Sequence, residues 1–184
     1  MIRSIRKADI PACVKLYNHY VENTTVSFEL DPVTEEEFSA RVESITQRYP
    51  YLVYEDDRTG EVLGYAYLSV YSVRLAYRFS CDLSIYVKKD MQAHGIGHML
   101  YSAIERLAYA QGFYSIIAVV SEENAISRRF HERQGFARMA DFDDIAFKQG
   151  RWIGVRYYSK FLRTPEDVPH ELKAPVTDYW EETE

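Results

Sequence analysis

The chain has 184 residues, enough for one domain with a buried core. Its net charge of −6 and the lack of any basic run longer than Lys88-Lys89 argue against a nucleic-acid partner, because binding to a phosphate backbone depends on clustered Lys and Arg. The aromatic content of 15%, with 16 tyrosines, favours an aromatic-lined site or a subunit interface. Two isolated cysteines, no signal peptide and no apolar run of about 18 residues predict a cytoplasmic protein without a membrane segment.

The first half of the chain predicts a strand, two helices and a hairpin. Hydrophobic residues fall on one face of a helix that begins near Asp9 and Pro11 and runs to about Asn23. After a loop, Thr34 and the three glutamates that follow it are typical of the start of a second helix, which we expect to reach about Tyr49. The strands of this half are expected at residues 1–6, 51–56 and 61–71, with a turn at 57–60.

The second half alternates strands and helices and ends in two adjacent strands. The strand at 79–87 carries its apolar side chains on one face, and the strand at 113–121 is apolar enough for a sheet interior. The remaining elements are expected as helices from about Gly95 to Ala108 and at 124–134, then strands at 136–147 and 151–162. This order predicts an α/β domain over residues 1–162, with a mixed, mostly antiparallel central sheet flanked by helices, and a mostly irregular extension over 163–184.

Two glycines one residue apart, Gly95 and Gly97, stand where the strand at 79–87 gives way to a helix. The first N–H groups of a helix lack internal partners, and glycine lets a ligand approach them closely, so this junction predicts an anion site. A P-loop would need Lys and then Ser or Thr after its second glycine, where His98 and Met99 stand. A dinucleotide fingerprint would need a third glycine, where Leu100 stands. Two interpretations of this junction remain: a site for a phosphate-bearing ligand of another class, or the plain start of a helix.

The stretch SIYVKKDMQAHGIGHMLYSAIERLAYAQGF, residues 84–113, resembles the coenzyme A pyrophosphate motif of the GNAT superfamily of N-acetyltransferases, and SIIAVVS with EENAISRRFHERQGF continues that resemblance. The resemblance implies acetyl-CoA as cosubstrate. The pyrophosphate is expected on Gln92, Ala93, His94, Gly95, Ile96 and Gly97, and the acetyl and pantetheine end on backbone groups of Ile85, Tyr86 and Val87. Asn124 is expected beside the pantetheine arm, a role compatible with capping the helix at 124–134, and Ser127 is expected among the cofactor contacts.

Short stretches spread over about residues 2–162 narrow the resemblance to the phosphinothricin acetyltransferase family. They are IRKADIPA, LYNHYVENTTVSFELDPVTEEEF, RYPYLV, RLAY, SIYV, FHERQGF and KQGRW…Y. This family acetylates the α-amino group of phosphinothricin, methionine sulfoximine, methionine sulfone and related amino acids. Its members are commonly homodimers, so the resemblance also implies a homodimer, against whose partner Tyr179 and Trp180 of the extension could lie.

Asp82 is the carboxylate that best suits the role of general base. An α-ammonium group must lose a proton before it attacks a thioester, and a carboxylate within reach can take that proton. Asp82 lies on the strand that leads to the glycine turn, on the face opposite Phe79, Cys81, Leu83 and Ile85. The resembling family usually has Glu at this position, so we expect the shorter Asp82 to act through an ordered water. The alternative is a carboxylate at the rim of the sheet with no part in catalysis.

His131 departs from the wider superfamily, which often has Tyr at this position as an acid towards the CoA sulfur. The phosphinothricin branch resembles this chain in having His there. The imidazole is therefore expected either to donate a proton to the leaving thiolate or only to pack in the core.

The substrate is expected to meet Phe28 and the stretch Arg74, Leu75, Ala76 and Tyr77. A guanidinium fork suits carboxylate, phosphinate or sulfone oxygens, and Arg74 and Tyr77 match the branch. Phe28 would form a wall of the pocket. A solvated loop arginine and a core phenylalanine are the alternatives.

The sequence is compatible with three functions. Acetylation of a small amino acid is the first, acetylation of a protein amino terminus or lysine is the second, and binding of acetyl-CoA without turnover is the third. No metal is expected, because the five histidines share no ligand spacing with a cysteine or carboxylate.

Overall fold

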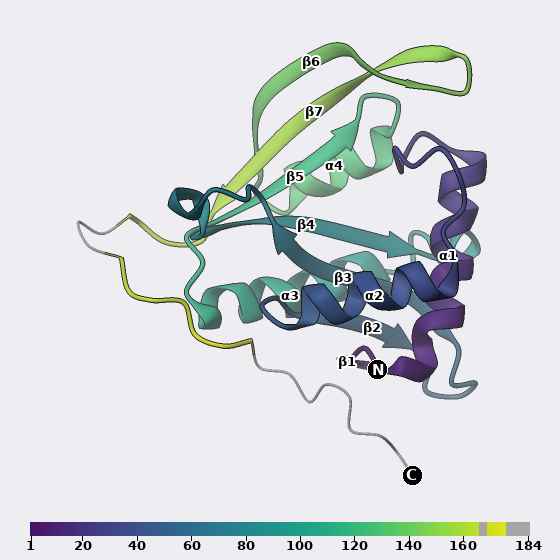
Figure 1. The fold of residues 1–184 in the computed structure, drawn as a ribbon, viewed down its shortest axis with the longest axis horizontal. Coiled ribbons are helices and arrows are strands. Elements are labelled where there is room, and N and C mark those ends of the chain that lie inside the picture. Colours follow the sequence, from purple (N-terminus) through teal and green to yellow (C-terminus); the bar gives the residue numbers. More distant parts are fainter. Residues whose placement is uncertain (166–168, 176–184) are drawn as a thin grey trace.

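The computed structural model describes residues 1–165 and 169–175, which form a seven-stranded sheet with helices on both faces (Figure 1). In chain order the elements are β1 (Ile2–Ser4), α1 (Ile10–Asn23), α2 (Glu35–Thr46), β2 (Tyr51–Glu55), β3 (Val62–Val70), β4 (Ser80–Val87), α3 (Ile96–Gln111), β5 (Ser115–Ser121), α4 (Ala125–Arg133), β6 (Ala137–Lys148) and β7 (Arg151–Phe161). Single 3₁₀ turns η1 (Lys7–Asp9), η2 (Leu75–Tyr77) and η3 (Lys89–Met91) join some of them. The expected element order is confirmed.

The strands lie in the order β1-β2-β3-β4-β5-β7-β6. Every neighbouring pair is antiparallel except β4 and β5, which are parallel. A parallel pair needs a crossover connection, and α3 supplies it. The predicted fold class, a mixed and mostly antiparallel sheet flanked by helices, is therefore confirmed.

Two hydrophobic clusters hold the helices against the sheet. Helix α3 buries Ile96, Leu100, Ile104 and Ala108 against one face, on the side where Cys81 and Leu83 of β4 point. Helices α1 and α2 cover the other face of β2 and β3 with Tyr17, Val21, Phe38 and Val42. The side-chain alternation of β4 thus turns Cys81 and Leu83 towards α3 and leaves Asp82 on the α1 side.

The start of α2 is as expected and its end comes earlier. The hydroxyl of Thr34 accepts a hydrogen bond from the N–H of Glu37 at 3.1 Å, and the carboxylate of Glu37 accepts one from the N–H of Thr34 at 2.9 Å. The helix ends at Thr46 rather than near Tyr49. Pro50 follows, and the residue before a proline is disfavoured in the helical region. Tyr49 instead stacks on Phe113, with ring centroids 5.7 Å apart.

The chain beyond β7 has no helix or strand in its described part. The segment 169–175 lies against the end of α3, where the N–H of Lys173 donates to the carbonyl of Gln111 at 2.8 Å. Leu172 lies so close to Gly112 that a Cβ added to this glycine would be 3.4 Å from the Leu172 side chain. Tyr179 and Trp180 lie outside the described residues. Among the described helices, none is long and apolar enough to cross a membrane.

Candidate functional site

The parallel strands β4 and β5 part in the middle of the sheet. They pair only from Ser80 with Ser115 to Asp82 with Ile117, although β4 continues to Val87 and β5 to Ser121. Both strands keep their other neighbours, β3 and β7, over the parted segment. An opening lined by backbone groups of both strands is the consequence, and Figure 1 shows the two strands diverging towards their carboxyl ends.

The edge of β4 offers two N–H groups to this opening. The N–H of Lys88 donates to the carbonyl of Leu63 on β3 at 2.8 Å, and the backbone groups of an antiparallel strand alternate in direction. Ile85 and Val87 therefore turn their N–H groups away from β3, towards the opening. The backbone of Tyr86 faces β3, and its side chain lies in the cluster of α1. Of the three residues expected at the acetyl end, two present backbone donors.

The turn after β4 leaves the start of α3 open. Ala93 and Gly95 both have positive φ, of 69° and 80°, and no side chain caps the helix. The first backbone bond of this helix end runs from the N–H of Met99 to the carbonyl of Gly95 at 3.0 Å. A Cβ placed on Gly95 would meet nothing within 4 Å. The free amides and the helix dipole together form a site with room for a phosphate group.

Two side chains of the turn are already engaged. The Nε2 of Gln92 donates to the hydroxyl of Tyr20 on α1 at 2.9 Å, and Tyr20 in turn donates to the carbonyl of Val87. His94 Nδ1 lies 3.0 Å from the carbonyl of Gln92. The hydroxyl of Tyr20 thus joins α1 to the end of β4, a contact that the sequence pattern of the helix did not predict.

Asp82 lies at the last paired residue before the opening, opposite Ser69 of β3 and Ile117 of β5. Its Oδ1 is buried and has no hydrogen-bond partner among the described residues. Burial raises the pKa of this carboxyl from 3.8 to about 7. A carboxylate whose pKa lies near neutral pH is suited to take a proton and release it again.

Tyrosines surround the face of the sheet that carries Asp82. Tyr86 lies with its ring centroid 5.2 Å from Tyr17 and 5.2 Å from Tyr65. Burial, with a smaller contribution from the charge of Asp82, raises the pKa of Tyr67 to about 12. Burial also raises the pKa of Tyr65 and Tyr86, so the phenols of Tyr65, Tyr67 and Tyr86 stay neutral at physiological pH. Burial is likewise the cause of the raised pKa of Asp82.

Helix α4 brings the remaining predicted residues to the β5 side of the opening. The Oδ1 of Asn124 accepts from the N–H of Ser127 at 3.0 Å, so Asn124 caps α4 and its amide group remains free to donate. His131 is only 6% exposed. Its Nδ1 lies 2.8 Å from the carbonyl of Ser127, which assigns the proton to that nitrogen.

The other nitrogen of His131 is then an acceptor. Nε2 is buried without a partner among the described residues, and burial lowers the pKa of the imidazole. The ring lies between Phe136, at 5.1 Å, and Tyr158, at 6.0 Å between centroids. A neutral imidazole in this position can accept a hydrogen bond, and it could serve as an acid only after it has gained a second proton.

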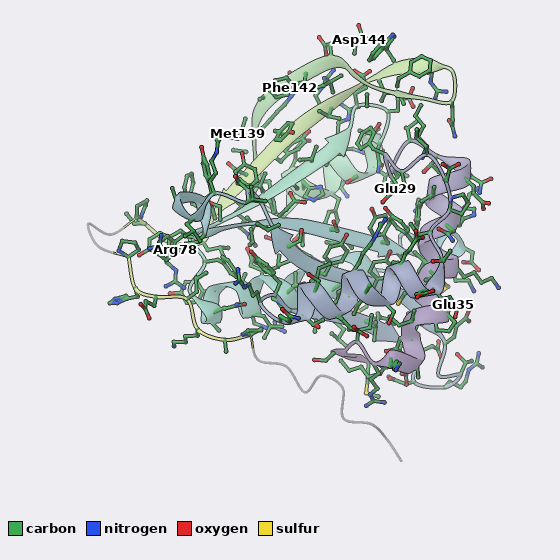
Figure 2. The ribbon with its side chains drawn as sticks, viewed as in Figure 1. Glu29, Glu35, Arg78, Met139, Phe142 and Asp144 are labelled. Carbon is green, nitrogen blue, oxygen red and sulfur yellow. The ribbon has the colours of Figure 1, made fainter. Side chains whose placement is uncertain are left out.

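The residues expected around the substrate lie at opposite ends of β4. Phe28 belongs to the loop between α1 and α2, which reaches the carboxyl end of β5 through a 3.2 Å contact between the hydroxyls of Thr25 and Ser121. Arg74 and η2 precede the amino end of β4 and are exposed. Figure 2 shows this separation, because it labels Glu29, the neighbour of Phe28, and Arg78, which directly follows η2. The structure does not bring the two groups together within one chain.

Within residues 1–165 and 169–175, no group of three or more His, Cys, Asp or Glu side chains is arranged to hold a metal ion.

Comparison with known proteins agrees with this geometry. The acetyltransferase (GNAT) domain family matches residues 2–155. A phosphinothricin N-acetyltransferase of Streptomyces viridochromogenes is 34% identical over 96% of this chain and 94% of its own length. An L-methionine sulfoximine/L-methionine sulfone acetyltransferase of Pseudomonas paraeruginosa is 33% identical over 91% of this chain and 98% of its own.

A solved structure extends the likeness to three dimensions. The phosphinothricin acetyltransferase of Sinorhizobium meliloti, crystallised with AcCoA, superposes with a TM-score of 0.86 at 32% identity, covering 92% of this chain and 95% of that one. The open helix start, the parted strands and these relatives agree on the cosubstrate. The chain belongs to the GNAT family and is an acetyl-CoA-dependent N-acetyltransferase.

Proposed function

We propose that the enzyme acetylates the α-amino group of a small amino acid of the phosphinothricin, methionine sulfoximine or methionine sulfone class. The support is that relatives named for these substrates match nearly the whole chain. The observation that carries the proposal is the buried Oδ1 of Asp82, which has no hydrogen-bond partner among the described residues and lies at the point where β4 and β5 part.

The proposed reaction is a direct transfer. Acetyl-CoA supplies a thioester-activated acetyl group. Asp82 takes one proton from the substrate ammonium through a water, and the freed nitrogen attacks the acetyl carbon. The N–H groups of Ile85 or Val87 on the open edge of β4 donate to the carbonyl oxygen as it gains negative charge. The C–S bond breaks, the second proton of the attacking nitrogen passes to the leaving thiolate to give CoA as the thiol, and Asp82 releases its proton to solvent.

His131 has two proposed parts that an experiment separates. Its buried, neutral ring supports a packing role or an acceptor role, whereas an acid role towards the thiolate needs the imidazolium form. If His131→Asn has the same pH–rate profile as the wild type, the acid role is dismissed. Loss of one ionisation from the profile would support it.

The substrate class is tested by the release of free CoA. The wild-type enzyme is assayed with methionine sulfone, methionine sulfoximine, phosphinothricin and a basic peptide that has a free amino terminus and lysines. Release with the amino acids and none with the peptide supports the proposal. Release with the peptide alone would favour a protein acetyltransferase, and calorimetric binding of acetyl-CoA without any release would favour a binding domain.

We also propose that the enzyme works in the cytoplasm as a homodimer. Both cysteines are free and buried, as suits a reducing compartment. Large apolar side chains that a partner could cover are exposed on the 71–79 loop and on the β6–β7 hairpin, and these are Val73, Leu75, Met139, Phe142, Ile145, Phe147 and Trp152. A partner would also explain how Phe28 and Arg74, separated within one chain, serve one substrate. Sedimentation of the wild type as a monomer at assay concentration would contradict the dimer.

A further inference from the structure

The tip of the β6–β7 hairpin carries two cations on one face. Gln149 and Gly150 form a two-residue turn, with φ of 53° and 75°. The turn makes Lys148 and Arg151 direct cross-strand partners. Side chains of directly opposite residues project to the same face of a hairpin, so both cations point the same way. Sequence reasoning placed these residues in the matched motif KQGRW and gave neither of them a role.

Lys148 holds the backbone of the loop between α1 and α2. The residue is only 4% exposed, and its Nζ donates to the carbonyl of Ser27 at 2.7 Å. No carboxylate of the described residues forms an ion pair with it, and burial lowers the pKa of its ammonium group. A charged donor that is buried to hold one main-chain carbonyl fixes the path of that loop, whatever side chain the loop carries there.

Arg151 holds the same loop two residues earlier. Its Nε and Nη2 donate to the carboxylate of Glu123 at 3.1 and 2.9 Å. The hydroxyl of Thr25 donates to that carboxylate at 2.8 Å. The hairpin therefore binds the loop at two residues: at Ser27 through Lys148, and at Thr25 through Arg151 and Glu123. Phe28 follows Ser27 directly in the chain. We call Lys148, Arg151 and Glu123 the hairpin clamp.

We propose that the hairpin clamp is a positioning device for the substrate loop, and that Lys148 thereby sets the affinity for the amino-acid substrate. The inference rests on the proposed function, because it assigns Phe28 to the substrate pocket. None of the three clamp residues needs to touch the substrate. Their effect is to keep the loop at the carboxyl end of β5, where Thr25 meets Ser121.

The kinetic test uses Lys148→Met, which keeps the length of the side chain and removes its charge. The KM for methionine sulfone is expected to rise about tenfold or more, since a hydrogen bond from a charged donor is lost, while the KM for acetyl-CoA changes less than about twofold. Lys148→Arg should recover part of the loss. Lys160→Met is the matched control, because Lys160 donates to the hydroxyl of Tyr101 on α3 and not to the loop. An unchanged KM for methionine sulfone, or an equal rise in both KM values, overturns the inference.

A second test does not depend on activity. Chymotrypsin cleaves after Phe28 and Leu30, and Lys148→Met is expected to be cut there several times faster than the wild type and Lys160→Met. If Lys148→Met does not fold, Thr25→Val removes the other attachment and should show the same cleavage. Equal cleavage rates in wild type and folded variants overturn the clamp. If the wild type acetylates none of the amino acids, the proposed substrate class fails, and the clamp is then decided by the cleavage rates alone.

Discussion

The two halves of the sheet, on either side of the opening between β4 and β5, differ in how completely the chain covers their apolar side chains. Strands β2 and β3 are covered on both faces, so that Tyr65 in the middle of β3 is 0% exposed. Strand β6, at the far edge, leaves Phe142 45% exposed, and Figure 2 shows this side chain and Met139 on the outer strand. A half whose apolar side chains are largely covered within one chain can hold the carboxylate of Asp82 and the phosphate site at the start of α3 in a defined position. A half with an uncovered apolar edge suits association.

Changes in β3 and β4 should therefore alter chemistry and cofactor binding, and changes on the outer face of β6 should alter association. Four experiments test this division, starting from the largest expected effect.

Asp82→Asn should lower kcat by about 10²- to 10⁴-fold, since the amide keeps the shape of the carboxyl and cannot take a proton. The KM for acetyl-CoA should stay close to that of the wild type. Steady-state rates with methionine sulfone measure both. A variant with undiminished kcat would remove Asp82 from the mechanism and leave the first half without its proposed base.

The same variant should be more stable than the wild type at high pH. The folded-state pKa of Asp82 is about 7, raised from 3.8 by burial, so between those values the folded protein binds more protons than the unfolded chain. The contribution of Asp82 to stability is therefore greatest at low pH and falls as the pH rises through 7. Each pH unit of displacement corresponds to about 1.4 kcal/mol, so the free energy of unfolding of Asp82→Asn should exceed that of the wild type by a few kcal/mol at pH 8.

Urea unfolding of both proteins between pH 5 and pH 9 measures this difference. The gap between the two curves should widen with pH and level off above about pH 8. A constant gap would mean that the carboxyl is not held in the buried surrounding described above.

Gly64→Ala should raise the KM for acetyl-CoA by about tenfold, corresponding to about 1.4 kcal/mol of lost binding. A Cβ at Gly64 would lie 2.9 Å from the carbonyl oxygen of Tyr86 and 3.3 Å from the Cα of Val87, so the open edge of β4 must shift. Gly154→Ala is the matched control in the other half, because its Cβ would lie 2.7 Å from Oε2 of Glu122 and 2.9 Å from the carbonyl of Phe142 on β6. Equal effects of the two variants on this KM would erase the distinction between the halves.

Phe142→Asp should leave the chemistry of one chain nearly unchanged and should weaken the proposed dimer. A charge in the centre of an apolar interface is expected to raise the dissociation constant at least about tenfold. Analytical ultracentrifugation over a concentration series measures it. Ile126→Asp on α4, also an exposed apolar position, serves as the control. If both variants sediment as the wild type does, the edge of β6 is not the interface.

Local sequence patterns were sufficient for the order of the elements and for the cofactor turn. Thr34 with Glu37 marks the start of α2, and the missing side chains of Gly95 and Gly97 mark the start of α3, because capping and backbone freedom depend on neighbouring residues only. The end of α2 was placed too late: Pro50 is a local signal against a helical Tyr49, whereas the stacking of Tyr49 on Phe113 joins residues far apart in the chain and could not be read from the sequence.

Contacts between distant segments could not be predicted in the same way. Nothing near Lys148 in the sequence indicates that its ammonium reaches Ser27, 121 positions away. The Gln149-Gly150 turn could have shown that Lys148 and Arg151 share a face, and it could not have shown what they face. Likewise, alternation along β4 placed Asp82 on the face opposite Cys81, whereas its raised pKa comes from burial, which depends on segments distant in the sequence.

The two-residue turn at Gln149 and Gly150 restricts how this enzyme can change over evolutionary time. Adding one residue there would rotate one of the flanking cations to the opposite side of the ribbon, because side chains in a strand alternate with every position. Insertions in pairs would keep the two cations aligned yet carry them beyond the reach of Thr25 and Ser27. The length of this two-residue turn is therefore as constrained as the identity of the two cations beside it.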